Sequence, residues 1–146
     1  MNSSNTAKLR LKFPALLRKH SSTPTPLDVR GVETCDGWYA LIHNLLKDIE
    51  ATALAAGLDP IKLIWPHILQ IKSKFGALSV SIDASSLYET HALSKDISDL
   101  EIVRNLIATA EAASLKTCES CGEPGAVIGG DWLHVKCPAC EANKEE

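Results

Sequence analysis

Residues 118–140 of the chain read CESCGEPGAVIGGDWLHVKCPAC, and this stretch decides how the C-terminal region folds. It holds two Cys-x-x-Cys pairs, Cys118 with Cys121 and Cys137 with Cys140, separated by fifteen residues. Zinc prefers four tetrahedral ligands and accepts thiolates readily, and this spacing fits the four-cysteine template for zinc sites. The sequence therefore predicts one structural Zn²⁺ ion, bound by these four cysteines in a zinc ribbon. Two disulfides or an iron–sulfur centre are the other interpretations of the same spacing.

The predicted zinc site has a structural role rather than a catalytic one. Four thiolate ligands leave no open position on the ion for water or substrate. The last 29 residues hold too little apolar material for a core of their own, so metal binding is expected to supply the missing free energy of folding. His134 lies between the two cysteine pairs, and with four cysteines present we expect it to be a surface or packing residue.

Length and composition fit one compact domain with a small appended module. Of the 146 residues, 45% are hydrophobic and 23% are charged, and these fractions exclude disorder throughout. The formal net charge is 15 − 18 = −3, which argues against a protein that coats nucleic acid by bulk charge. No apolar run is long enough to cross a membrane, so no membrane partner is expected. We expect a cytoplasmic protein, and in that reducing compartment paired cysteines more often bind metal than form disulfides.

The charge pattern divides the chain into three parts. Residues 1–27 carry five basic side chains and no acidic one, so the remaining residues carry −3 − 5 = −8. We predict a basic N-terminal segment with a Pro/Ser linker over residues 1–30, an α+β core over 31–115, and the zinc ribbon with an acidic tail over 116–146. Within the first part, a short helix is expected over Ala15–Lys19 and an extended linker over Ser21–Pro26.

Two segments have the apolar periodicity of helices. The first runs from Gly37 to Ala56, with Asp36 as its N-cap and Gly57 in a left-handed C-terminal position. The second runs from Ser98 to about Leu115, and Ser98 and Glu101 match a capping box at its start. Both are expected to bury an apolar stripe against a common core.

Strand-like runs lie between the two predicted helices. Ile61–Trp65 and Ile68–Ile71 are rich in β-branched and bulky residues, and Pro66 interrupts them, which suggests an edge strand or a bulge. Residues 78–82 alternate between apolar and polar, as in a half-buried strand. Residues 72–76 (KSKFG) are expected to connect the strands as a hairpin, and residues 84–96 to form a loop. The predicted fold is therefore α+β, with two main helices packed on a small antiparallel sheet and a C-terminal zinc ribbon.

Cys35 is the fifth cysteine, and two interpretations apply to it. It precedes a helix, where the dipole favours a thiolate, so with His43 it is a candidate pair of nucleophile and base. No third orienting group or glycine-rich elbow accompanies the pair, and a buried or partly buried structural cysteine is the favoured interpretation. The chain also lacks a phosphate-binding glycine-rich loop and the G-x-S-x-G and H-E-x-x-H motifs. We therefore expect a protein that is not an enzyme.

Three blocks in order make the chain resemble a group of small uncharacterised proteins encoded by phages and prophages. They are CDGWY at 35–39, QIKSKFGAL at 70–78, and AEAAS at 110–114 followed by CESCGEPG at 118–125, Trp132 and the second cysteine pair. The chain departs from the family pattern at Ser73, where Glu is usual, and at Ser79, where a basic residue is common. The resemblance implies a mobile-element protein with a zinc-bearing C-terminus. Phe75 and Gly76 could have a functional role, but a hairpin that needs one aromatic anchor and one glycine explains them equally well.

Two classes of function fit these observations. The first is a non-enzymatic accessory protein that binds a macromolecule of the bacterial host, such as a defence or transcription protein, since the acidic body suits a basic partner surface. The second is a zinc-ribbon protein that binds nucleic acid, with the basic N-terminal segment contacting phosphates. The negative charge of the ribbon weighs against the second class, and the sequence does not specify an oligomeric state.

Overall fold

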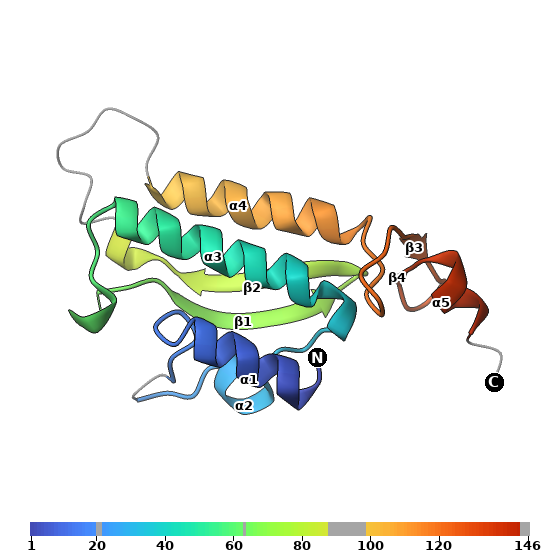
Figure 1. Cartoon of the computed structure of the whole chain (residues 1–146), viewed down its shortest axis with the longest axis horizontal. Helices are drawn as coiled ribbons and strands as arrows, with labels where there is room; N and C mark the ends of the chain where they lie inside the picture. The colour runs from blue at the N-terminus through green and yellow to red at the C-terminus, as the bar shows by residue number, and fades with distance from the viewer. Residues whose placement is uncertain (20–21, 63, 88–98, 144–146) are drawn as a thin grey trace.

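The structure is a computed structural model that describes residues 1–19, 22–62, 64–87 and 99–143 (Figure 1). Its helices are α1 (Ser3–Lys12), α2 (Pro26–Arg30), α3 (Tyr39–Ala55), α4 (Asp99–Ser114) and α5 (Pro138–Ala142), with short 3-10 turns η1 (Asp36–Trp38), η2 (Pro60–Lys62) and η3 (Ser85–Leu87). Its strands are β1 (His67–Lys74), β2 (Ala77–Asp83), β3 (Ala126–Ile128) and β4 (His134–Lys136).

The predicted fold class is confirmed, because α3 and α4 pack together against the two-stranded sheet β1–β2 (Figure 1). α3 buries Ile42, Leu45 and Ile49, which recur at helical spacing on one face. Gly57 follows the helix with a φ of +81°, the left-handed conformation that favours glycine at a helix end. In α4 the buried side chains are Val103, Ala110 and Ser114, while Ser98 of the predicted capping box lies outside the described residues.

The hairpin between β1 and β2 is confirmed and is tighter than the sequence indicated. Residues 72–74 belong to β1, where Lys74 pairs with Ala77, so the turn consists of Phe75 and Gly76 alone. Both turn residues have positive φ, +52° for Phe75 and +76° for Gly76, which is the pattern of a type I′ turn. The predicted role of Phe75 as an aromatic anchor is wrong, since its side chain is 80% exposed.

The strand predicted over Ile61–Trp65 is also wrong. Residues 60–62 form the 3-10 turn η2, and β1 begins only after Pro66. Pro60 and Pro66 bracket this segment, and both remove a backbone donor that a strand ladder would need. Of the predicted loop at 84–96, residues 85–87 form η3, and residues 88–96 lie outside the described part of the chain.

The N-terminal segment differs most from the prediction. The helix expected over Ala15–Lys19 is absent, and α1 lies earlier, starting behind the N-cap Asn2. α2 occupies Pro26–Arg30, where Thr25 and Asp28 form a capping box that sequence inspection missed. The predicted three-part division of the chain remains a prediction, but residues before 31 contribute to the same hydrophobic cluster as the rest: Leu9, Phe13, Leu16, Leu17 and Leu27.

The same segment covers the outer edge of β1. The Ile68 amide donates to the Leu16 carbonyl (2.9 Å), and farther along the strand Glu33 exchanges two backbone hydrogen bonds with the neighbours of Lys72. The Arg18 guanidinium donates to the Trp65 carbonyl at 3.0 Å. The outer edge of β1 is therefore largely occupied from within the chain.

No helix in the described ranges is both long enough and apolar enough to cross a membrane.

Candidate metal centre

The first cysteine pair lies in a tight turn just after α4. The Cys118 amide donates to the Glu123 carbonyl at 2.7 Å, and the Gly122 amide donates to the Cys118 carbonyl at 2.9 Å. Gly122 has a φ of +84°, so the chain can reverse here without the strain that a side chain would introduce. These bonds turn the backbone around Cys118 and direct both sulfurs of the pair toward the same side.

The second pair starts the short helix α5. Cys137 is the N-cap, with extended backbone angles, and its sulfur accepts a hydrogen bond from the Cys140 amide at 3.4 Å. Pro138 occupies the first helical position, where the missing amide hydrogen has no partner to lose. The strands β3 and β4 return the chain from the first pair to the second, with Val127 paired to Val135.

The four sulfur atoms form one cluster, all within 4.8 Å of one another. A tetrahedral zinc–thiolate site with ~2.3 Å bonds has sulfurs about 3.8 Å apart, and Cys121 and Cys137 are separated by 3.6 Å. The cysteines are all free, and 3.6 Å is far beyond the ~2.05 Å of a disulfide bond. The cluster can therefore hold a metal ion, and its donor set suits zinc.

Proton affinities within the metal-free cluster are uneven. Burial alone would raise the pKa of Cys118. Hydrogen bonds from the backbone amides of Cys121, Cys137 and Ser120 outweigh this effect and lower the pKa to about 6. Hydrogen bonding with the sulfurs of Cys121 and Cys137 raises the pKa of Cys140 to about 12. The backbone thus favours the thiolate of Cys118, whereas the raised pKa values of Cys121 and Cys140 favour protons that a bound metal ion would displace.

A buried carboxylate lies beside the cluster, and sequence inspection missed its role. Glu119 is 4% exposed and accepts from His134 Nδ1 at 2.8 Å and from Lys136 Nζ at 3.3 Å. His134 therefore packs against a carboxylate, as expected of a residue outside the ligand set. The signal in the sequence was the alternation of His134 and Lys136 on one face of β4, opposite the turn that carries Glu119.

Two residues of the CDGW block fasten the cysteine turn to the body of the protein. The Gly37 amide donates to the Glu119 carbonyl at 2.8 Å, and the Trp38 indole N–H donates to the Thr117 carbonyl at 2.8 Å. A Cβ atom on Gly37 would lie 2.4 Å from the Cys118 carbonyl oxygen, which is not a possible contact. Only glycine permits this approach of two backbones, and we call Gly37, Trp38 and their partners Thr117 and Glu119 the latch.

Asp36, the neighbour of the latch, does not cap α3 as predicted. Its carboxylate accepts hydrogen bonds from the Asn2 amide at 2.9 Å and from the side chains of Asn2 and Asn5, both at 3.0 Å. These bonds, the Asn2 amide first, lower the pKa of Asp36. The residue therefore ties α1 to the start of η1.

Cys35 is exposed, which corrects the prediction of a buried or partly buried residue. Partial desolvation and the nearby Glu119 carboxylate raise its pKa, so the thiolate of a nucleophile is disfavoured there. The candidate base His43 lies elsewhere, against the rings of Phe13 (5.1 Å between centroids) and Tyr39 (6.1 Å). The described contacts thus do not unite Cys35 and His43 in a catalytic pair.

Comparison with protein-family models found no match, and searches of curated proteins and of solved structures found no significant match.

Proposed function

We propose that the chain is a non-enzymatic binding protein whose C-terminal ribbon is ordered by one structural Zn²⁺ ion. The observation that carries the proposal is the cluster of four cysteine sulfurs within 4.8 Å. Cys118, Cys121, Cys137 and Cys140 would hold the ion, and four thiolates would leave it no open position for substrate. A reducing cytoplasm, where thiols persist, suits such a site better than an oxidising compartment.

The resemblance to phage and prophage proteins supports a role as an accessory protein that binds a macromolecule of a bacterial host. The acidic balance of the chain, −3 overall, favours a host protein with a basic surface. The basic N-terminal segment gives less support to nucleic-acid binding than its charge suggests. Arg10 donates to the Leu17 carbonyl at 3.1 Å, and Arg18 donates to backbone carbonyls around Pro66, so two of its five cations already serve the fold.

Metal analysis tests the zinc site. Elemental analysis of the native protein should find about one zinc per chain, and the double substitution Cys118→Ser with Cys121→Ser should abolish it. Cys35→Ser is the control, because it removes the one thiol outside the cluster and should leave the zinc content unchanged. Native protein without zinc, or with iron in its place, would overturn the proposal.

Affinity purification tests the binding role. The tagged zinc-loaded protein should recover a partner in a fixed ratio from a host lysate. The cysteine double variant should recover less of it, because its ribbon surface is lost. Recovery of no partner under either condition would count against a binding protein.

A further inference from the structure

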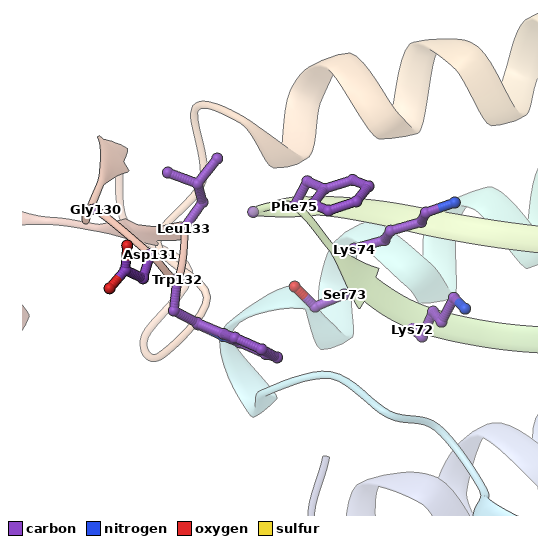
Figure 2. Close-up of a pocket in the computed structure, with 9 residues that line it drawn as sticks. Lys72, Ser73, Lys74, Phe75, Gly130, Asp131, Trp132 and Leu133 are labelled. Carbon is purple, nitrogen blue, oxygen red and sulfur yellow. The ribbon is translucent and has the colours of Figure 1, made fainter.

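A groove of ≈ 450 Å³ lies where the ribbon meets the tip of the β1–β2 hairpin (Figure 2). Two segments line it, residues 72–76 of the hairpin and residues 130–133 of the β3–β4 connection. The segments touch at Gly76, where an added Cβ would come within 3.1 Å of Leu133. The groove therefore exists only when the ribbon is folded and docked.

Two exposed aromatic rings flank this groove. Phe75 is 80% exposed and Trp132 is 75% exposed, and in Figure 2 they lie on either side of Ser73. The other two tryptophans of the chain, Trp38 and Trp65, are buried. Exposed rings that gather around one hollow, while the other two tryptophans are buried, are typical of a binding surface.

The backbone at Phe75 strengthens this interpretation. Among the described residues it is the one non-glycine residue with positive φ. A type I′ turn favours Asn or Gly at this position, and an L-residue with a bulky side chain is strained there. Its ring is exposed, so burial does not offset the strain. Backbone strain that is not offset by packing occurs mostly at functional sites, so it points to a functional role for Phe75.

The groove also carries positive charge. Lys72 and Lys74 line it, against one carboxylate, Asp131. Lys74 Nζ lies 5.6 Å from the centroid of the Phe75 ring, within cation–π range. Neither lysine forms an ion pair within the described part of the chain.

Carboxylates in the neighbouring hollow are already paired. That hollow shares Lys72 and Trp132 with the groove and includes Glu33 and Glu119. Glu33 lies 3.3 Å from Arg30, and Glu119 is held by His134 and Lys136. The acidic side chains next to the groove therefore do not neutralise its lysines.

We propose that this groove binds a short stretch of single-stranded nucleic acid, with bases stacked on Phe75 and Trp132 and phosphates at Lys72 and Lys74. Unpaired bases present a π-face to any exposed ring, and stacking on aromatic side chains beside cations is how single strands are bound without sequence preference. Bases in a duplex are already stacked and do not offer their faces. The proposal rests on the proposed function, because the zinc-ordered ribbon supplies Trp132.

Trp132 fluorescence and a labelled single strand provide the test. Zinc-loaded full-length protein, with its zinc content measured in the same sample, is titrated with an oligothymidine of about ten nucleotides. We expect quenching of tryptophan emission and a log–log salt slope of about −1.4, since about two phosphates are contacted at ~0.7 each. A duplex of equal length should bind more weakly.

Four variants assign the binding to the groove. Trp132→Leu and Phe75→Asn should each weaken oligothymidine binding about tenfold. Phe75→Asn also suits the turn, so we expect this variant to keep the folded hairpin while it loses the ring. The double variant Lys72→Gln with Lys74→Gln should flatten the salt slope, whereas the matched Lys47→Gln with Lys62→Gln, on other exposed positions, should not.

The outcomes separate the two proposals. Zinc-loaded protein that fails to bind oligothymidine at low salt overturns the groove assignment and leaves the zinc site intact. The groove assignment is also overturned if the Phe75 and Trp132 variants bind oligothymidine as tightly as the wild type. It is likewise overturned if the wild type binds duplex or polyglutamate as tightly as it binds oligothymidine. A sample without zinc contradicts the proposed function instead.

Discussion

The body and the ribbon are held together by different means. The body buries large side chains such as Trp38, Phe13 and Ile49 in one continuous cluster. In the ribbon, over residues 116–143, the buried residues are Cys118, Glu119, Val135 and Cys137, of which Val135 alone is neither a proposed ligand nor charged. The body is thus stabilised by the hydrophobic effect. The ribbon buries too little apolar surface for that, so it depends on the latch and, in our proposal, on a metal ion.

Removal of the proposed metal ion should have the largest effect, because it should unfold the ribbon and leave the body folded. Chelation, or Cys118→Ser with Cys121→Ser, should cost the ribbon on the order of 10 kcal/mol of metal-binding free energy. The body should keep its helices and its thermal transition. Limited proteolysis followed by mass spectrometry should show cuts after residue 116 and protection before it. Simultaneous loss of body and ribbon would mean that the two regions fold as one unit.

The latch offers the next test. Gly37→Ala would place a Cβ against the Cys118 carbonyl oxygen and weaken the hydrogen bond from residue 37 to Glu119. We expect a loss of about 3 kcal/mol, from forced separation of two backbones and a lost hydrogen bond. Denaturant unfolding measures the change. Gly130→Ala, where an added Cβ meets nothing within 4 Å, is the matched control and should be close to neutral.

A substitution at the hairpin tip should raise the stability of the protein instead of lowering it. Phe75→Asn replaces a strained residue by one that the type I′ turn favours, so the free energy of unfolding should rise by about 1 kcal/mol. Thermal unfolding of both proteins measures this gain. A loss of stability would indicate that the Phe75 ring stabilises the fold despite its exposure.

The smallest expected effect concerns the start of the body. Hydrogen bonds from Asn2 and Asn5 lower the pKa of Asp36 in the folded protein, so its contribution to stability is present above the unfolded pKa of an aspartate and is lost as pH falls through the folded pKa. Asp36→Asn should therefore be less stable than wild type at neutral pH, and the difference should shrink in acid. Denaturation midpoints at a series of pH values measure it. A difference independent of pH would exclude the charge of Asp36 as its cause.

Local sequence patterns correctly predicted the elements whose structure depends on a single segment of the chain. Three patterns were sufficient to predict a helix, a strand and a cysteine cluster. They are the periodicity around Ile42 and Ile49, the alternation over residues 78–82, and the spacing of the cysteines. The clustering of the four predicted ligands follows from that spacing, since each pair forms its own turn. The metal's identity remains a proposal.

Features that depend on distant partners could not be predicted in the same way. Leu9 and Phe13 belong to the common hydrophobic cluster, and the basic charge of their segment gave no indication of this burial. The groove joins Phe75 to Trp132 across 57 residues, so no single stretch of sequence shows that the two exposed rings lie at one site.

The latch also has a consequence for the order of folding. Trp38 and Thr117 are 79 residues apart in the chain, whereas Cys118 and Cys140 are 140 − 118 = 22 residues apart. Closing the longer loop is entropically harder, so it becomes favourable only after α3, the hairpin and α4 have brought its ends together. During synthesis the ribbon emerges after the body, so the surface around Gly37 can already be formed, and the proposed metal site can assemble before the ribbon docks.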